Sequence, residues 1–305
     1  MRKLLTVLLV LSLFLPAALA ESTWAPLPLD DVEAIPHVAS PDHYILDNEG
    51  EVVGYEDETL SVTVERLWIG EARFNVAHIK IADASQLRTG LAVPNARKTN
   101  KVSAIAANHN AVIAIGGDYF TKDKVGPAIR MGKLFQEPVP GNRVHYTRDM
   151  LFIDQNGDFM ILQKPNIEDY QAMRDSGNVV NAFTFGPGLV IDGELIETDP
   201  DHYAYALDHQ DARAAIGQIG PLEYLLVVVD GDNRAGSKGC TGAVLAQFMY
   251  DQGCVQAFNM DGGGSAYMYF NGANYSEKSV SAERSLSDII YFGTLVDYGL
   301  DAEAK

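Results

Sequence analysis

The residues best suited to chemistry form a glycine-rich segment, Asn-Met-Asp-Gly-Gly-Gly-Ser, at positions 259–265. Three successive glycines let the backbone approach a ligand closely and point N–H groups at an anion. Asp261 follows an apolar stretch, so its carboxylate is placed to act as a base, a nucleophile or a metal ligand. The same residues would also suit a tight turn. We treat the segment as a candidate site because loops at the ends of strands often carry one.

Two further acidic clusters also follow apolar stretches. One holds Asp118 and Tyr119 within Gly-Gly-Asp-Tyr-Phe, and the other begins at Asp230 within Asp-Gly-Asp-Asn-Arg. Each carboxylate has the same potential roles as Asp261, and each cluster has the same alternative explanation, a tight turn. The second cluster is not a calcium loop, because Arg234 and Ala235 stand where an EF-hand requires an oxygen ligand and a glycine.

Two arginines are candidates for binding a phosphate group. Arg213 lies in Ala-Arg-Ala-Ala-Ile-Gly, and Arg284 follows Glu283. A guanidinium recognises phosphate through two parallel hydrogen bonds, although an isolated arginine more often forms a structural ion pair, here with Glu283. Zinc-binding, P-loop, dinucleotide-binding and serine-hydrolase motifs do not occur in the sequence.

The hydrophobic pattern predicts the strands and helices that carry these residues. Alternating or continuous apolar runs predict strands at 60–69, 74–82, 111–115, 224–229 and 255–260. Apolar runs on either side of Asn-Gly and Asp-Gly predict hairpins at 150–162 and 189–196. Helical spacing predicts helices at 101–108 and 241–251.

These elements predict an α/β (mixed α+β) fold, a single domain with a mixed β-sheet flanked by helices. The strand, helix and strand near residues 224–260 predict a βαβ unit. Cys240 and Cys254 flank its helix, whose ends lie roughly 18 Å apart, so we expect no disulfide between them.

Composition and the N-terminus bound the class of protein. The chain has 305 residues, a net charge of −18 and a pI near 4.6, which disfavours binding to nucleic acid or anionic lipid. Residues 1–20 combine a basic start, an apolar run and Ala-Leu-Ala, which predicts a cleaved signal peptide. We therefore expect a secreted, envelope or periplasmic protein without stable membrane insertion.

The remaining chain divides by composition into three parts. From Glu21 to Glu65 there are twelve acidic residues and no Lys or Arg, and several prolines fall within the first half of this stretch. This pattern predicts an acidic leader at 21–59, which we interpret as a solvated spacer. The catalytic or binding domain is then expected at 60–298, with a tail at 299–305.

At this level of detail the chain resembles the phosphodiester glycosidase family. NMDGGGSAYM at 259–268 resembles the hallmark Asn-Leu-Asp-Gly-Gly-Gly-Ser of that family, and NKVSAIAANHNAVIAIGGDYF at 100–120 resembles the helix and strand that lead into its Asn-Gly-Gly-Tyr-Phe motif. Four further segments follow in the expected order: FGPGLVIDGE (185–194), ARAAIG (212–217), VVVDGDNRAGSKGCT (227–241) and AERSLSD (282–288). The resemblance covers roughly residues 60–298.

The resemblance implies hydrolysis of a sugar 1-phosphodiester to a sugar and a phosphomonoester. It implies a carboxylate facing the anomeric carbon and a clamp on the leaving phosphate. Asp261, Asp118 and Glu283 are then the catalytic candidates. The candidates for binding the substrate or its phosphate are Arg213, Arg284, Asn259, Gly262, Gly263, Gly264, Ser265, Tyr119 and Asp230. Its partner would be a carbohydrate phosphodiester or another anionic glycan.

Four residues depart from the family pattern. Gly116 and Asp288 stand where Asn is usual, and Ala212 and Ala214 stand where Pro and Thr are frequent. The missing Asn leaves open altered specificity or a degenerate site. Two alternatives therefore remain, a non-catalytic module that binds envelope or exopolysaccharide glycans, and a metal-dependent phosphodiesterase. In the second alternative a divalent metal would be held by Asp118, Asp230 and Asp261.

Overall fold

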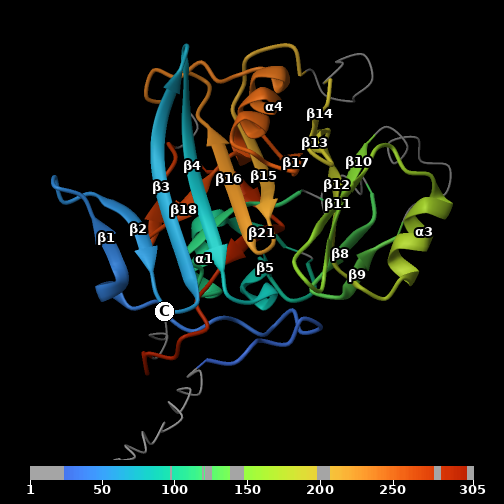
Figure 1. The fold of residues 1–305 in the computed structure, drawn as a ribbon, viewed down its shortest axis with the longest axis horizontal. Helices are drawn as coiled ribbons and strands as arrows, with labels where there is room; N and C mark the ends of the chain where they lie inside the picture. Colours follow the sequence, from blue (N-terminus) through green and yellow to red (C-terminus); the bar gives the residue numbers. More distant parts are fainter. Residues whose placement is uncertain are drawn as a thin grey trace, which may run out of the picture.

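A computed structural model describes residues 24–96, 98–118, 120, 126–137, 148–197, 207–277 and 283–300. β-Strands dominate this part of the chain and form one large sheet and two smaller ones (Figure 1). A fourth, minor pairing joins β20 (Ser285–Leu286) to β6 (Asn100–Lys101).

The largest sheet has nine strands in the order β1-β2-β3-β4-β16-β15-β17-β13-β14. Alternating burial along β3 reflects its position with one face on the core, whereas β16 is buried almost throughout. The bounds are β1 (Tyr44–Leu46), β2 (Val52–Glu56), β3 (Leu60–Ile69), β4 (Ala72–Ile81), β13 (Gly188–Ile191), β14 (Glu194–Leu195), β15 (Arg213–Gly220), β16 (Glu223–Val229) and β17 (Gln256–Met260).

Each of the smaller sheets has five strands. The first follows the order β11-β10-β12-β8-β9 and the second the order β19-β18-β7-β21-β5. The first comprises β8 (Ala128–Arg130), β9 (Lys133–Gln136), β10 (Asp149–Asp154), β11 (Phe159–Leu162) and β12 (Val179–Phe185). The second comprises β5 (Leu87–Leu91), β7 (Ile113–Gly116), β18 (Met268–Phe270), β19 (Ala273–Asn274) and β21 (Asp288–Phe292).

Helices cover the sheets at three places. In Figure 1, α3 (Ile167–Asp175) lies outside the first small sheet, and α4 (Gly242–Asp251) lies over the large one. α1 (Val102–Asn108) contacts β7, β18 and β21 of the second small sheet. Among the described residues, none of the helices combines the length and apolar character needed to cross a bilayer. The short 3₁₀ helices are η1 (Pro41–His43), η2 (Ala84–Gln86) and η5 (Gly263–Ser265).

The expected mixed sheet is wrong. All pairings between the described strands are antiparallel, and the fold is predominantly β with helices at its surface. β16, α4 and β17 do succeed one another, but β15 lies between the two strands and pairs with both. Because β16 and β17 are each antiparallel to β15, they run parallel to each other, so β16, α4 and β17 form the expected strand–helix–strand unit. The sheet has no parallel pairing because the β15–β16 hairpin places β15 between these two strands.

Residues within the predicted leader contribute to the fold. β1 and β2 extend the large sheet beyond β3. The preceding segment is fixed by the fully buried Arg88, which donates hydrogen bonds to the carbonyl oxygens of Pro28 and Asp31. The described part of the leader is therefore packed against the domain.

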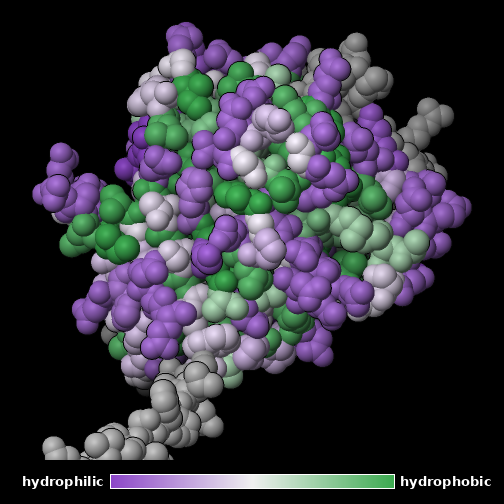
Figure 2. Space-filling view, in the orientation of Figure 1, coloured by the Kyte–Doolittle hydropathy of each residue, from purple (hydrophilic) through white to green (hydrophobic). Residues whose placement is uncertain are grey.

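The largest hydrophobic cluster lies between the three sheets. It combines side chains from β3, β7, β10, β16, β17 and β21, so each sheet contributes one face. On the surface view, polar and apolar residues are interspersed (Figure 2). Cys240 and Cys254 are buried and unpaired, as expected.

Candidate active site

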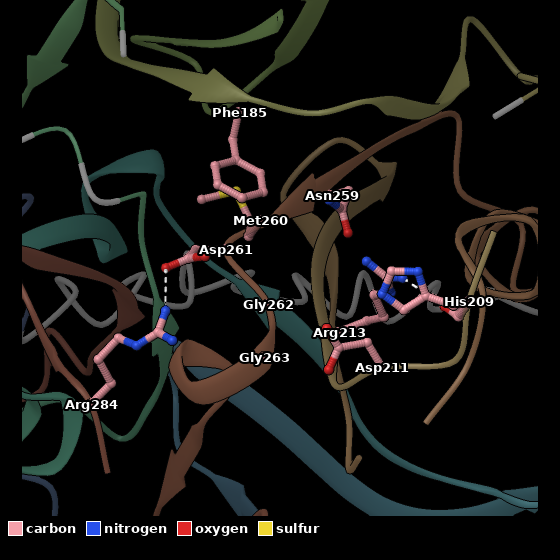
Figure 3. Close-up of a pocket in the computed structure, with 10 residues that line it drawn as sticks. All are labelled: Phe185, His209, Asp211, Arg213, Asn259, Met260, Asp261, Gly262, Gly263 and Arg284. Carbon is pink, nitrogen blue, oxygen red and sulfur yellow. Dashed lines mark hydrogen bonds and ion pairs between the residues drawn. The ribbon is translucent and has the colours of Figure 1, made fainter. Parts of the chain in front are cut away.

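The candidate site is a cavity of about 280 Å³ at one edge of the large sheet (Figure 3). Because β15 and β17 are antiparallel, with Ala214 opposite Met260, the start of β15 and the end of β17 meet at this edge. The lining residues are Phe185, His209, Asp211, Arg213, Asn259, Met260, Asp261, Gly262, Gly263 and Arg284.

Asp261 lies within this cavity. It is only 6% exposed, and its Oδ2 has no hydrogen-bond partner. The Arg284 guanidinium lies 4.0 Å from Oδ2. Burial raises the pKa of Asp261 to about 6, while a hydrogen bond from Ser265 and the charge of Arg284 oppose the shift. A carboxylate oxygen without a hydrogen-bond partner, on a residue that lines a cavity, is suited to act on a ligand.

Two glycines allow close backbone contacts at the site, one between residue 264 and Arg284 and one between residue 262 and the Ala212 carbonyl oxygen. A Cβ on Gly264 would lie 3.1 Å from Nη2 of Arg284, and one on Gly262 would lie 2.7 Å from the Ala212 carbonyl oxygen. Arg284 also donates a hydrogen bond to Ser265 Oγ at 3.1 Å. Its side chain is 51% exposed, so the guanidinium can still contact a ligand.

A second set of polar side chains lies across the Gly262–Gly263 backbone from Arg284, as Figure 3 shows for His209, Asp211 and Arg213. Arg213 donates hydrogen bonds to the carbonyl oxygens of Cys240 and His209, and it is only 6% exposed. The two predicted phosphate-binding arginines therefore belong to opposite ends of one pocket.

Asp118 lies outside the cavity lining, in a fully buried ion cluster. Arg130 binds Asp118 Oδ1 at 2.7 Å through Nη2 and Asp288 Oδ2 at 2.5 Å through Nε. Asp118 also accepts hydrogen bonds from the backbone N–H groups of Phe120 and Thr184. The structure thus gives Asp118 the partners of a structural carboxylate, although its charge still raises the pKa of Asp261.

The cluster predicts a pH-dependent stability. Burial raises the pKa of Asp288 to about 7, with Asp118 adding to the shift and Arg130 opposing it. In an unfolded chain this carboxyl would titrate near 4, so from about pH 4 to 7 the unfolded state binds fewer protons and stability falls. Asp288→Asn should therefore raise the melting temperature more at pH 8 than at pH 5, by roughly 2–4 °C or more. Thermal melts at the two pH values would refute this if the gain were equal.

Glu283 lies at the N-terminus of α1. Its carboxylate accepts hydrogen bonds from Ser103 N at 3.0 Å and Ser103 Oγ at 3.1 Å. The N-cap residue, Lys101, makes no side-chain cap hydrogen bond, so Glu283 supplies one from a distant part of the chain. Glu283 is not among the residues that line the cavity.

Asp230 is also held away from the cavity. Its carboxylate pairs with Arg73 Nε at 2.7 Å and accepts a hydrogen bond from Glu277 N. Since Asp118 is bound to Arg130, the three carboxylates of the metal-dependent alternative do not form one ligand set. The described residues contain no cluster of three or more His, Cys, Asp or Glu able to hold a metal. Tyr119 lies outside the described residues.

Asn259 in the glycine-rich segment and Gly116, which packs against that segment, both have structural roles. Asn259 donates a hydrogen bond from Nδ2 to the Gly186 carbonyl oxygen, which ties β17 to the end of β12, and its Oδ1 has no partner. Gly116 packs against the segment from β7. A Cβ there would lie 2.9 Å from the Ser265 carbonyl oxygen and 2.6 Å from Leu286 Cδ1, so this backbone has no room for a side chain at 116.

The structure adds four cavity residues that were not among the predicted site residues, of which one, Met260, ends β17 within the glycine-rich segment. Phe185 ends β12, while His209 and Asp211 precede β15. Phe185 lies in the segment FGPGLVIDGE, and His209 and Asp211 lie just before Arg213. They could have been predicted as site residues only from their position beside segments that resemble the family.

Comparisons with known proteins identify the family of the chain. The model of the phosphodiester glycosidase family matches residues 109–293, which include Asp261, Arg213 and Arg284. Among curated proteins, the SPbeta prophage-derived uncharacterized protein YomE of Bacillus subtilis is 31% identical over 110 residues. That match spans 36% of this chain and 17% of YomE.

Two solved structures share the fold. The catalytic domain of zebrafish N-acetylglucosamine-1-phosphodiester alpha-N-acetylglucosaminidase, auto-inhibited by its pro-peptide, has a TM-score of 0.59 at 18% identity. The match covers 82% of this chain and 87% of that one. A hypothetical protein from Synechocystis has a TM-score of 0.53 at 16% identity, covering 77% and 62% of the two chains. The family match spans more than half of the sequence, and the chain belongs to the phosphodiester glycosidase family.

Proposed function

We propose that the pocket hydrolyses the glycosidic bond of a sugar 1-phosphodiester. The observation that carries this proposal is the carboxylate of Asp261, a residue that lines the cavity, whose buried Oδ2 has no hydrogen-bond partner and lies 4.0 Å from Arg284. A carboxylate next to a guanidinium can act on an anomeric carbon whose leaving group is a phosphate. The zebrafish protein that shares the fold is an N-acetylglucosamine-1-phosphodiester alpha-N-acetylglucosaminidase, which supports the same class of substrate.

The position proposed for Asp261, next to the anomeric carbon, determines which bond breaks. The bond between the anomeric carbon and the bridging oxygen breaks, and its electron pair leaves with the phosphomonoester. Asp261 acts on the anomeric carbon as a nucleophile, or on water as a base, and both roles need the ionised carboxylate. Water supplies the new oxygen on the sugar and its proton is taken up by the carboxylate or by solvent.

Arg284 and the glycine backbone stabilise the leaving group in this scheme. Phosphate needs little help from a general acid, but its negative charge needs hydrogen-bond donors in a cavity shielded from water. Arg284 is exposed enough to meet it, whereas Arg213 is largely occupied by carbonyl oxygens and would contribute charge at the opposite end. Phe185 lies above Asp261 in Figure 3 and offers an apolar face to a sugar ring.

The pKa of Asp261 predicts the acid side of the pH profile. Because the ionised form is required and its pKa is raised to about 6, kcat/KM should fall about tenfold per unit as the pH drops below 6. Initial rates between pH 4 and 8 measure this limb. A rate that rises toward pH 4 would instead assign Asp261 the role of a proton donor.

The N-terminus and the proposed reaction together suggest where the protein acts and on what substrate. We propose that residues 1–20 direct export and that the substrate is a carbohydrate phosphodiester or anionic glycan outside the cytoplasm. The signal-like N-terminus supports this placement. A binding module would use the same pocket without turnover.

Turnover by the purified protein tests the proposed function. It would be incubated with N-acetylglucosamine-α-1-phosphodiesters and a panel of other sugar 1-phosphodiesters, with and without EDTA. Release of free sugar and phosphomonoester that survives EDTA supports the glycosidase. Activity lost on chelation supports the metal-dependent phosphodiesterase, and binding without release supports the non-catalytic module.

A further inference from the structure

We propose that Arg234 is a positioning residue that turns the N–H side of the glycine loop toward the pocket, where the loop binds the substrate phosphate. The glycine loop is defined as Gly262–Ala266. This inference rests on the proposed function for the identity of the anion. Arg234 belongs to the Asp-Gly-Asp-Asn-Arg cluster, which the reaction itself leaves without a role.

The Arg234 guanidinium lies behind the glycine loop. It is 1% exposed at the side chain and is not among the cavity-lining residues. Nη2 donates a hydrogen bond to the Gly263 carbonyl oxygen at 3.1 Å, and Nη1 contacts the carbonyl oxygens of Ala266 at 3.5 Å and Glu277 at 3.3 Å. One side chain thus contacts carbonyl oxygens at both ends of η5 and the carbonyl oxygen of Glu277.

These contacts fix the orientation of the loop peptides. In a trans peptide the carbonyl oxygen and the following N–H point in opposite directions. Since the Gly263 oxygen points at Arg234, the N–H of Gly264 points away from it. Gly264 is not among the residues that line the cavity, but a Cβ on it would lie 3.1 Å from Nη2 of Arg284, so it lies against the arginine that we assign to the phosphate. The Gly263 and Ser265 N–H groups already bind the oxygens of Ala212 and Gly262.

The turn that carries Arg234 is itself anchored. Asp230 is buried against Arg73, and its carbonyl oxygen accepts a hydrogen bond from Ser237 Oγ. The N–H of Arg234 bonds to the Gly231 carbonyl oxygen, and that of Ser237 bonds to the Arg234 carbonyl oxygen. The cluster predicted to bind phosphate therefore supports the loop from its rear side. A planar guanidinium can contact several carbonyl oxygens at once, which a single ammonium group does less well.

The test compares Arg234→Lys with Arg88→Lys. Arg88 is a matched control because it is also buried and donates to carbonyl oxygens, but of Pro28, Asp31 and Ser85. Backbone amide shifts of Gly262, Gly263 and Gly264 would be followed by NMR as inorganic phosphate is added. A second readout is KM and kcat on any sugar phosphodiester that the wild type hydrolyses. Melting temperatures would show that the variants remain folded.

We expect phosphate to shift the Gly264 amide in the wild type and to bind roughly tenfold more weakly to Arg234→Lys. KM should rise by a similar factor with kcat changed less, while Arg88→Lys loses stability without either effect. If Arg234→Lys does not fold, Arg234→Gln, which keeps one donor, carries the same expectation. The inference is overturned if a folded Arg234 variant binds phosphate like the wild type, or if phosphate leaves the wild-type glycine amides unmoved. Wild-type turnover, measured separately, tests the proposed function.

Discussion

Asp261→Asn should lower kcat by about three orders of magnitude, the range expected when a group that takes or gives a proton is removed. The substitution keeps the size of the side chain but removes the negative charge that acts on the anomeric carbon or on water. KM should change little, because Arg284 and the glycine loop bind the phosphate. Steady-state kinetics of the purified variant would measure both constants.

Stability separates this result from simple unfolding. Because the folded pKa of Asp261 is raised to about 6, its ionisation destabilises the fold at neutral pH, and the Asn variant should melt no lower than the wild type at pH 7. Glu283→Gln is the matched control, since that carboxylate caps α1 and lies outside the cavity lining. It should cost about 1 kcal/mol of stability and retain kcat. Full activity in Asp261→Asn would remove this residue from the mechanism.

Arg284→Met should lower kcat/KM by roughly 10- to 100-fold, mainly through KM. A charge-assisted hydrogen bond contributes about 1.5–3 kcal/mol, and Met fills a similar length of side chain without donating. The same change leaves Asp261 without its nearby cation, which raises the pKa of this carboxyl further and moves the acid limb to higher pH. Kinetics against substrate concentration at several pH values would show both effects.

Arg174→Met is the control for Arg284→Met. Arg174 lies at the surface of α3, where it pairs with Glu137 and Asp175. Its loss should leave kcat/KM within twofold of the wild type, because exposed ion pairs contribute little. An unchanged KM in Arg284→Met would contradict the assignment of Arg284 to the phosphate.

Local sequence patterns were sufficient to predict most elements around the site. The alternation in β3, the continuous apolar run in β16 and the helix between Cys240 and Cys254 all lie close to their predicted ranges. The glycine run also marked the end of β17 correctly, because only glycine tolerates the contact of residue 262 with the Ala212 oxygen. Local patterns could not predict that all neighbouring strands pair antiparallel, because this pairing depends on the position of β15 between β16 and β17.

The distinction between the carboxylates depends on distant partners. Asp118 and Asp261 both follow a buried strand and adjoin glycines, so their local sequences indicate the same roles. Arg130 and Asp288, far along the chain, make Asp118 part of a buried cluster, whereas Oδ2 of Asp261 has no hydrogen-bond partner. For the same reason the sequence did not reveal that Glu283 caps α1.

Hydrolysis by the wild-type protein in oxygen-18 water shows which bond of the phosphodiester is cleaved. The purified protein would be given a sugar 1-phosphodiester that it turns over, and both products would be analysed by mass spectrometry. If Asp261 acts at the anomeric carbon, the released sugar carries the label and the phosphomonoester does not. Label in the phosphomonoester would mean that the P–O bond is cleaved, and would contradict the glycosidase mechanism.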